Sequence, residues 1–310
     1  PNCFIAVLFN WYGKLTSAVR WCNCMSESFG IKAGVRQGGI LSPILFNIYM
    51  DDLSVQLCDS GYGCFINRQF VGCIMYADDI IVLSASVFGL QKLLDKCYDY
   101  CSVVGLSLNA RKSNCMIVGG KSRSQISEMT IGGQAIEWTS SFKYLGVTFV
   151  AGKNLKIDCS AIRRKFYAAC NGLLSRCKHV AENVKLYLVQ VYCLLLLTYC
   201  MGALSLSPND IAEIGVCWND AFRRIYGLHR WESVAPLQSY TNSLSLKLLY
   251  HYHAWNFADE IREDYKGQVP VLVKCVFETR KYEYGLQSNF SDMYKFYGRS
   301  RSGKRSAIVE

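Results

Sequence analysis

Short apolar runs separated by polar turns dominate the first half of the chain. Two of them, residues 71–75 and 80–83, are rich in β-branched side chains and flank the tetrapeptide Tyr76-Ala77-Asp78-Asp79. Runs of this length and composition are typical of buried strands. The pattern therefore predicts a β-hairpin that carries two adjacent carboxylates at its turn.

Longer apolar stretches with helical spacing lie on both sides of this hairpin. One helix is predicted over residues 44–57, after Ser42 as N-cap and Pro43 in the first turn. Another is predicted over residues 90–104. It is followed by the basic turn 105–113, by a strand over 114–118 and by a short strand over 142–147.

Helical patterns continue from about residue 155 to 227. Arg163, Arg164 and Lys165 fall opposite an apolar face, which suits either a nucleic-acid backbone or plain solvent. Residues 186–206 carry no charge, so a membrane span and a buried helix are both considered, and the buried helix is preferred.

Two more helices and a basic tail are predicted from residue 208 onward. Pro208 opens a helix that ends near Tyr226, because Gly227 suits its C-terminus. On that helix Trp218 and Phe222 share one face and are expected in the core. Beyond it, a helix over 245–261 and a basic tail over 297–305 are predicted.

The paired carboxylates suggest metal chemistry. Burying them unpaired costs several kcal/mol, on the order of the effective penalty for a desolvated ion. Mg²⁺ binds a few carboxylates together with substrate phosphates, so Asp78 and Asp79 indicate metal-assisted phosphoryl or nucleotidyl transfer. For the tetrapeptide alone, a solvated Asp-Asp turn is the alternative.

A second candidate segment is Gly34-Val35-Arg36-Gln37-Gly38-Gly39. Gly38 and Gly39 permit close approach of a ligand to the backbone. Arg36 and Gln37 precede a helix N-terminus, a place suited to anions.

Composition supports a folded protein with a polyanionic partner. The 310 residues are 51% hydrophobic, which argues against general disorder, and the net charge is +10. Such a charge favours nucleic acid, although an ordinary basic enzyme would share it. The 16 cysteines form no disulfide framework or zinc pattern, so we expect reduced thiols and an intracellular location in the nucleus, the cytoplasm or both.

Four segments together resemble a known family. GVRQGGILSPILFNIYMDDL, YADDIIVL, GLSLNARKS and FKYLGV occur in the order and spacing of reverse transcriptases, and are most similar to those of non-LTR (LINE-type) retrotransposons. The resemblance implies an α+β fold: a partial right-hand polymerase palm over residues 1–150, a helical thumb over 151–232 and a C-terminal helical region over 233–310. RNA-dependent RNA polymerases are a weaker match, since they more usually carry Gly before the Asp pair.

The resemblance also implies roles for individual residues. Asp78 and Asp79 would hold Mg²⁺, or alternatively Mn²⁺. The Lys112 side chain would lie near the triphosphate as a cation and would protonate the leaving group. The nucleotide and template pocket would include Arg36, Gln37 and Gly38, with Tyr76 bracing the hairpin near the primer end. The primer would be gripped by Phe142, Tyr144, Leu145 and Gly146.

The implied partners are an RNA template, a DNA primer and deoxynucleoside triphosphates, with no membrane. Two-metal polymerases need a third carboxylate from an earlier strand, yet residues 1–50 contain no Asp and only Glu27. Asp51 and Asp52 are read as a solvated helix face. We therefore expect an N-terminally truncated polymerase that is inactive alone; the alternative is a non-catalytic nucleic-acid-binding remnant.

Overall fold

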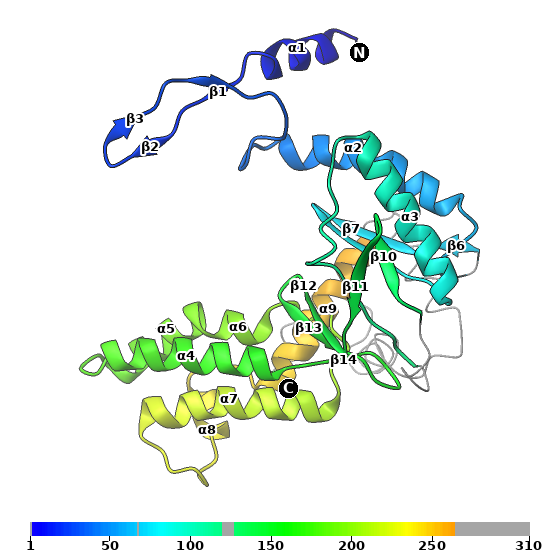
Figure 1. Cartoon of the computed structure of the whole chain (residues 1–310). Helices are drawn as coiled ribbons and strands as arrows, with labels where there is room; N and C mark the ends of the chain where they lie inside the picture. The colour runs from blue at the N-terminus through cyan, green and yellow to red at the C-terminus, as the bar shows by residue number, and fades with distance from the viewer. Residues whose placement is uncertain (1, 67, 120–126, 264–310) are drawn as a thin grey trace. The chain divides into compact units, whose positions relative to one another are not determined.

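The computed structural model describes residues 2–66, 68–119 and 127–263, which form helices and small β-sheets (Figure 1). The chain divides into two compact units. The first comprises residues 1–64 and 70–107, and the second comprises residues 65–69 and the chain from residue 108 onward.

The first unit begins with exposed elements. Helix α1 (Asn2–Tyr12) has no buried residue. It is followed by two antiparallel pairs of very short strands: β1 (Thr16–Ser17) with β4 (Phe29–Gly30), and β2 (Arg20–Trp21) with β3 (Cys24–Met25). The sequence analysis predicted none of these strands, because two residues are too few to show the alternation that identifies a strand.

The core of the first unit lies between α2 (Ser42–Cys58) and α3 (Val87–Val103). Its buried side chains include Leu53, Leu57 and Leu93. Helix α3 begins where the Ser86 hydroxyl accepts a hydrogen bond from the backbone N–H of Gly89, at 3.1 Å. Both helices begin two to three residues earlier than the apolar pattern predicted.

The hairpin of β7 (Cys73–Tyr76) and β8 (Asp79–Val82) contacts α3 through β8. A separate two-stranded sheet pairs β5 (Phe65–Ile66) with β6 (Gln69–Phe70).

The second unit opens with two small three-stranded sheets. One has the order β10 (Met129–Ile131), β11 (Gln134–Trp138) and β9 (Asn114–Cys115), with β9 parallel to β11. The other has the order β12 (Ser141–Tyr144), β13 (Val147–Val150) and β14 (Lys156–Ile157), all antiparallel. The strand predicted over 114–118 is thus only two residues long, because β11 pairs only with Asn114 and Cys115.

Six helices follow among the described residues, and they share one hydrophobic core (Figure 1). They are α4 (Ser160–Arg176), α5 (Glu182–Tyr192), α6 (Leu194–Thr198), α7 (Pro208–Tyr226), α8 (Ala235–Tyr240) and α9 (Leu246–Glu263). Val234, Leu246 and Tyr250 belong to this core. The same core therefore continues across residue 232, where the boundary between the thumb and the C-terminal region was expected. The predicted basic tail lies outside the described residues.

The uncharged stretch 186–206 is not one helix, and the prediction of a single buried helix was wrong. It is divided between the end of α5 and α6, and Cys200 beyond them has a φ of +53°. Among the helices of the described residues, none is long and apolar enough to cross a membrane.

The bounds predicted for α7 are confirmed. Ser207 and Asp210 form a reciprocal capping box at its start, and Gly227 ends it with a φ of +68°. The rings of Trp218 and Phe222 meet edge to face with centroids 5.0 Å apart. Both side chains are at most 1% exposed, so they are core residues as predicted.

Replacing Trp218 should therefore destabilise the second unit. We expect Trp218→Ala to lower the free energy of unfolding by about 3–5 kcal/mol, since it leaves a cavity and an unpaired Leu244 carbonyl that the indole N–H contacts at 3.1 Å. The matched control is Val216→Ala, at a position two residues away that is 53% exposed. This change should alter the free energy of unfolding by at most about 0.5 kcal/mol. Equal effects of the two changes in denaturant titrations would contradict this core assignment.

Candidate functional site

The two carboxylates are presented by a hairpin with a two-residue turn. Tyr76 pairs with Asp79 across the strands, so Ala77 and Asp78 alone form the connection. Ala77 has a φ of +51°, in the left-handed region that side chains other than glycine rarely occupy. A turn this short fixes Asp78 and Asp79 next to each other at the tip.

The two faces of this hairpin differ. Side chains at alternate positions lie half-buried on one face, and they come from Cys73, Met75, Ile80 and Val82. Burial raises the pKa of the Cys73 thiol to about 11. Burial, with the nearby thiols of Cys73 and Cys101, raises the pKa of Cys97 on α3 to about 12. This face of the hairpin therefore packs on α3.

The opposite face is mostly open among the described residues, although Ile81, the cross-strand partner of Ile74, is half-buried. Ile74 and Tyr76 are 49% and 61% exposed, and Asp78 and Asp79 are also exposed. The prediction of buried strands was therefore wrong for this face, because only one side of the two-stranded sheet is covered. The argument from buried, unpaired carboxylates does not apply to Asp78 and Asp79.

The donor set of this turn fits a divalent cation that is shared with a substrate. Mg²⁺ is usually held by one or two carboxylates, several waters and substrate phosphates, and adjacent exposed carboxylates meet that need. Within residues 2–66, 68–119 and 127–263, no group of three or more His, Cys, Asp or Glu side chains could hold a metal ion. The turn thus offers two of the carboxylates that such a metal site would need.

The loop before α2 is organised by backbone contacts. The Ser42 hydroxyl donates to the Arg36 carbonyl at 2.5 Å, and the Gly39 N–H donates to the same carbonyl at 3.0 Å. Leu41, without a side-chain hydrogen bond, occupies the N-cap position, so the prediction of Ser42 as N-cap was wrong. The Ser42 side chain closes the loop instead.

This closed loop presents polar side chains to solvent. Arg36, Gln37 and Gly38 are exposed, and Gly38 has a φ of +78°, which suits glycine. In the described part of the chain, no hydrogen bond or ion pair joins the loop to the hairpin.

Asp51 and Asp52 on α2 are exposed, in agreement with a solvated helix face.

Lys112 lies in the second unit, in a turn held by Asn109. The Lys112 backbone N–H donates to the Asn109 carbonyl at 3.1 Å and to its side-chain oxygen at 3.2 Å. Ser113 adds a hydroxyl contact to the Asn109 carbonyl at 3.0 Å, and Ala110 is buried. The backbone is therefore fixed while the Lys112 side chain is exposed.

The segment 142–146 forms a tight hairpin rather than the single strand that was predicted. Tyr144 pairs with Val147, and Leu145 and Gly146 form the turn with φ values of +44° and +84°. Phe142 stacks on its cross-strand partner Phe149 with ring centroids 5.4 Å apart. Two successive positive φ values match the tight turns that follow the natural twist of a hairpin.

One residue at this turn was not predicted from the sequence. The Tyr199 hydroxyl donates to the Leu145 carbonyl at 2.8 Å, and a Cβ on Gly146 would stand 3.2 Å from the Tyr199 ring. Tyr199 follows α6 and is separated from Leu145 by 54 positions. The only sequence signal was a tyrosine at the end of an apolar run, whose hydroxyl needs a polar partner.

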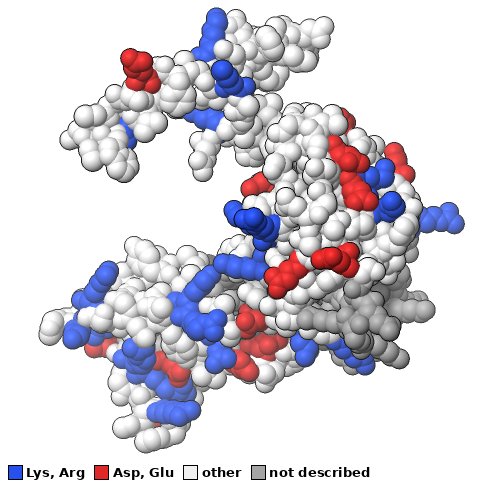
Figure 2. Space-filling model, viewed as in Figure 1, with Lys and Arg blue, Asp and Glu red and all other residues white. Residues whose placement is uncertain are grey.

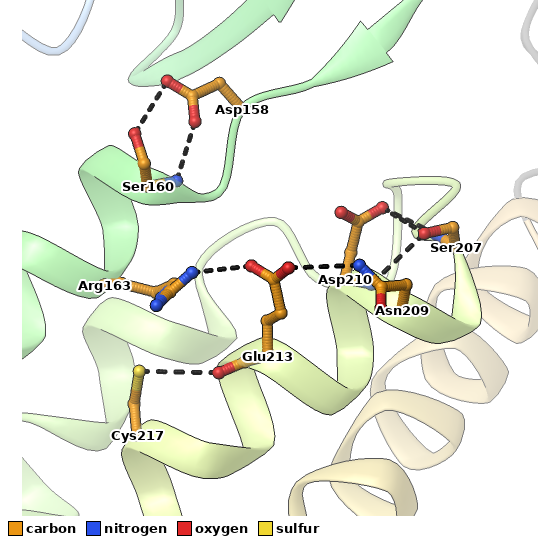
Figure 3. A network of polar contacts seen from close by, with 8 residues as sticks. All are labelled: Asp158, Ser160, Arg163, Ser207, Asn209, Asp210, Glu213 and Cys217. Atoms are coloured by element: carbon orange, nitrogen blue, oxygen red, sulfur yellow. Dashed lines mark hydrogen bonds and ion pairs between the residues drawn. The ribbon is translucent and has the colours of Figure 1, made fainter.

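The basic face predicted on α4 consists of Arg163, Arg164 and Lys165, and the charge of Arg163 is neutralised by an ion pair. Arg163 donates to the Glu213 carboxylate at 2.6 Å, and Asn209 contacts the other oxygen of that carboxylate at 3.1 Å (Figure 3). At the start of the same helix, two hydrogen bonds from Ser160 hold the pKa of Asp158 below its usual value. Arg164 and Lys165 remain exposed. Figure 2 shows Lys and Arg side chains gathered over the helices of the second unit.

Comparison with known proteins finds similarity over about half of the chain. Residues 4–149 match the family described as reverse transcriptase (RNA-dependent DNA polymerase). The Pol polyprotein of the type-2 retrotransposable element R2DM of Drosophila melanogaster is 34% identical over 161 residues, which are 49% of this chain and 15% of that protein. The RNA-directed DNA polymerase from the mobile element jockey of Drosophila funebris is 28% identical over 172 residues, 54% of this chain and 18% of that protein.

A third relative is the Pol polyprotein of the type-1 retrotransposable element R1 of Nasonia vitripennis. It is 27% identical over 153 residues, which are 45% of this chain and 42% of that protein. The chain thus spans less than half the length of each of these relatives.

The close approach of Tyr199 to Gly146 can be tested with a pair of glycines. We expect Gly146→Ala to destabilise the second unit by about 1–3 kcal/mol more than Gly133→Ala, because a new methyl group must displace the Tyr199 ring. Gly133 is the matched control: its φ is +78° in another hairpin turn, but nothing lies within 4 Å of its Cβ position. Denaturant titrations measure the difference, which should vanish in a Tyr199→Ala background. A difference that persists there would show that Tyr199 is not its cause.

Proposed function

We propose that residues 4–149, which match the reverse transcriptase family, form a polymerase domain of the non-LTR retrotransposon type, and that the chain is the palm-and-thumb part of an RNA-directed DNA polymerase. Such an enzyme joins a deoxynucleotide to the 3′ end of a DNA primer along an RNA template. The observation that carries the proposal is the exposed pair Asp78–Asp79 at a rigid two-residue turn, within the segment that matches the family.

Asp78 and Asp79 are proposed as ligands of Mg²⁺, with Mn²⁺ as the alternative ion. When bound, such an ion offsets the negative charge of the triphosphate and of the reacting oxygens. Asp78 is the better candidate for direct contact, because it lies in the turn itself and Asp79 already belongs to β8. A complete two-metal site needs a further carboxylate, which the described residues do not bring to this turn. The chain alone is therefore expected to bind nucleic acid without extending a primer.

The proposed nucleotide and template pocket uses the loop before α2 and one face of the hairpin. Arg36 and Gln37 are held by a closed loop and exposed, so they can reach a phosphate or a base edge. Gly38 lets the backbone approach a ligand. Tyr76 and Asp79 are cross-strand partners and share a face, so the Tyr76 ring can support the primer end beside the carboxylates.

The second unit would supply the cation for the leaving group and the contacts to the primer. Lys112 is proposed as the acid that protonates pyrophosphate, because its backbone is fixed and its ammonium group is exposed. The tight turn of Phe142, Tyr144, Leu145 and Gly146 is proposed as the primer grip. In this proposal Tyr199 positions the primer grip, and α4 to α7 form a thumb that exposes the cations Arg164 and Lys165.

An intracellular location is part of the same proposal. It is supported by the free thiols of the 15 cysteines in the described residues, most of them buried or half-buried within apolar surroundings.

The first test replaces Asp78 in a longer polymerase that carries this segment and a third carboxylate. We expect Asp78→Asn to lower primer extension by more than about 10²-fold, because a neutral amide offsets less of the charge at the reacting phosphate. Folding and template affinity should stay nearly unchanged, since Asp78 is exposed. Asp99→Asn, an exposed change on α3 of the same unit, is the control and should leave extension intact. Extension of Asp78→Asn within tenfold of the control would refute the catalytic assignment.

The second test concerns Lys112 in the same enzyme. We expect Lys112→Ala to lower the rate of nucleotide incorporation by about 10²–10⁴-fold while changing the apparent nucleotide affinity much less. Arg111→Ala, an exposed change at the neighbouring position, should have little effect. Single-turnover kinetics over a range of nucleotide concentrations separates the two quantities. If only the affinity falls, Lys112 binds the triphosphate and does not transfer a proton.

A further inference from the structure

Figure 1 shows the segment that joins α7 to α8. This segment carries an exposed pair of stacked aromatic rings. The rings of His229 and Trp231 are nearly parallel, with an interplanar angle of 2° and centroids 4.8 Å apart. Trp231 is 80% exposed, so most of the indole surface faces solvent although one side is covered by the imidazole. Exposure alone does not mark a contact site, because Tyr240 is equally exposed; Trp231 differs in that its ring is stacked on a second ring.

The stack is held in place before any ligand arrives. Glu232 closes a turn, because its backbone N–H donates to the His229 carbonyl at 3.1 Å and its carboxylate accepts from the His229 N–H at 3.1 Å. The Arg223 guanidinium on α7 donates twice to the Glu232 carbonyl, at 3.4 and 3.3 Å. Val234, 4% exposed, anchors the chain in the core directly after the turn. A fixed platform loses less conformational entropy on binding than a mobile one.

The charge around the stack favours an anionic ligand. Arg230 occupies the turn between the two stacked residues and is exposed, and no ion pair engages it within the described chain. The carboxylate of Glu232 is occupied by the His229 N–H, and the nearby Arg223 is paired with Asp220 at 3.1 Å. Arg230, which precedes Trp231 in the sequence, is therefore an exposed cation that remains available in this turn.

We propose that His229, Arg230 and Trp231 form a binding site for one unpaired base of single-stranded nucleic acid. The base would stack on the open face of Trp231, and Arg230 would contact the adjacent phosphate. A planar aromatic face beside a guanidinium is the arrangement that binds single strands without reading their sequence. The site rests on the proposed function only in that nucleic acid is the expected partner; none of its residues belongs to the proposed active site.

The test compares single-stranded and duplex RNA on the purified chain. The probes are a fluorescent oligouridine of about 12 nucleotides, long enough for one binding surface, and a blunt duplex of similar length. We expect Trp231→Ala to weaken single-strand binding by about 5- to 140-fold, the loss typical of one stacked base. Duplex binding should change less than twofold, because a paired base offers no open face. Tyr240→Ala, which removes an aromatic ring that is 81% exposed in the same unit, is the control and should affect neither probe.

Salt titration separates the stack from the phosphate contact. Trp231→Ala should leave the salt dependence of single-strand binding unchanged, whereas Arg230→Ala should reduce its log–log slope by about 0.7, the value for one lost phosphate contact. Unchanged single-strand affinity of Trp231→Ala, or an equal loss on the duplex, would overturn the site and leave the proposed polymerase function untouched. If the wild-type chain binds neither probe at low salt, the nucleic-acid part of the proposed function fails together with the site.

Discussion

The two-residue turn between β7 and β8 is the constraint on which the proposed active site depends. Because Tyr76 pairs with Asp79, the chain must reverse through Ala77 and Asp78 alone, and Ala77 accepts a left-handed conformation to do so. A longer loop would let the carboxylates move apart to reduce their repulsion. The pairing of the strands, supported by the packing of one hairpin face on α3, holds the two charges together and leaves them open to solvent, ready for a cation.

A similar principle organises the second unit, where a side chain helps to fix each of several tight turns. Tyr199 holds the Leu145 carbonyl and covers Gly146, Asn109 holds the turn of Lys112, and Arg223 holds the Glu232 carbonyl. In each case a polar group contacts the backbone and leaves the neighbouring side chains exposed. Turns that are ordered in this way present functional groups in one arrangement, which lowers the entropic cost of binding.

Local signals made some of these elements predictable from the sequence. The bounds of α7 followed from Pro208 and Gly227, because a helix start and a helix end each depend on a few adjacent residues. The carboxylate hairpin followed from two apolar runs around a polar tetrapeptide. The proposed site residues were identified through four motifs, and the match over residues 4–149 supports the family that those motifs indicated.

Other features could not be read from local patterns. The stretch 186–206 contains no charge and no proline, so nothing in it marked the break between α5 and α6. The exposure of one hairpin face depends on what covers the sheet, which the alternation of apolar residues does not reveal. The contact between Tyr199 and Leu145 joins residues 54 positions apart, and such pairs are set by tertiary packing.

The same distinction explains why Trp218 and Trp231, thirteen positions apart, have opposite roles. Trp218 lies on the apolar face of a regular helix, so helical spacing alone places it in the core, where it is 1% exposed. Trp231 follows the helix-ending Gly227, beyond the reach of any periodic pattern, and its exposure of 80% is set by the hydrogen bonds of one turn. An indole that the fold could have buried but holds in water is more informative about function than one in the core. An imidazole stacked on one side of the indole, and an exposed arginine next to it in the sequence, match a nucleic-acid base with its phosphate in shape and charge.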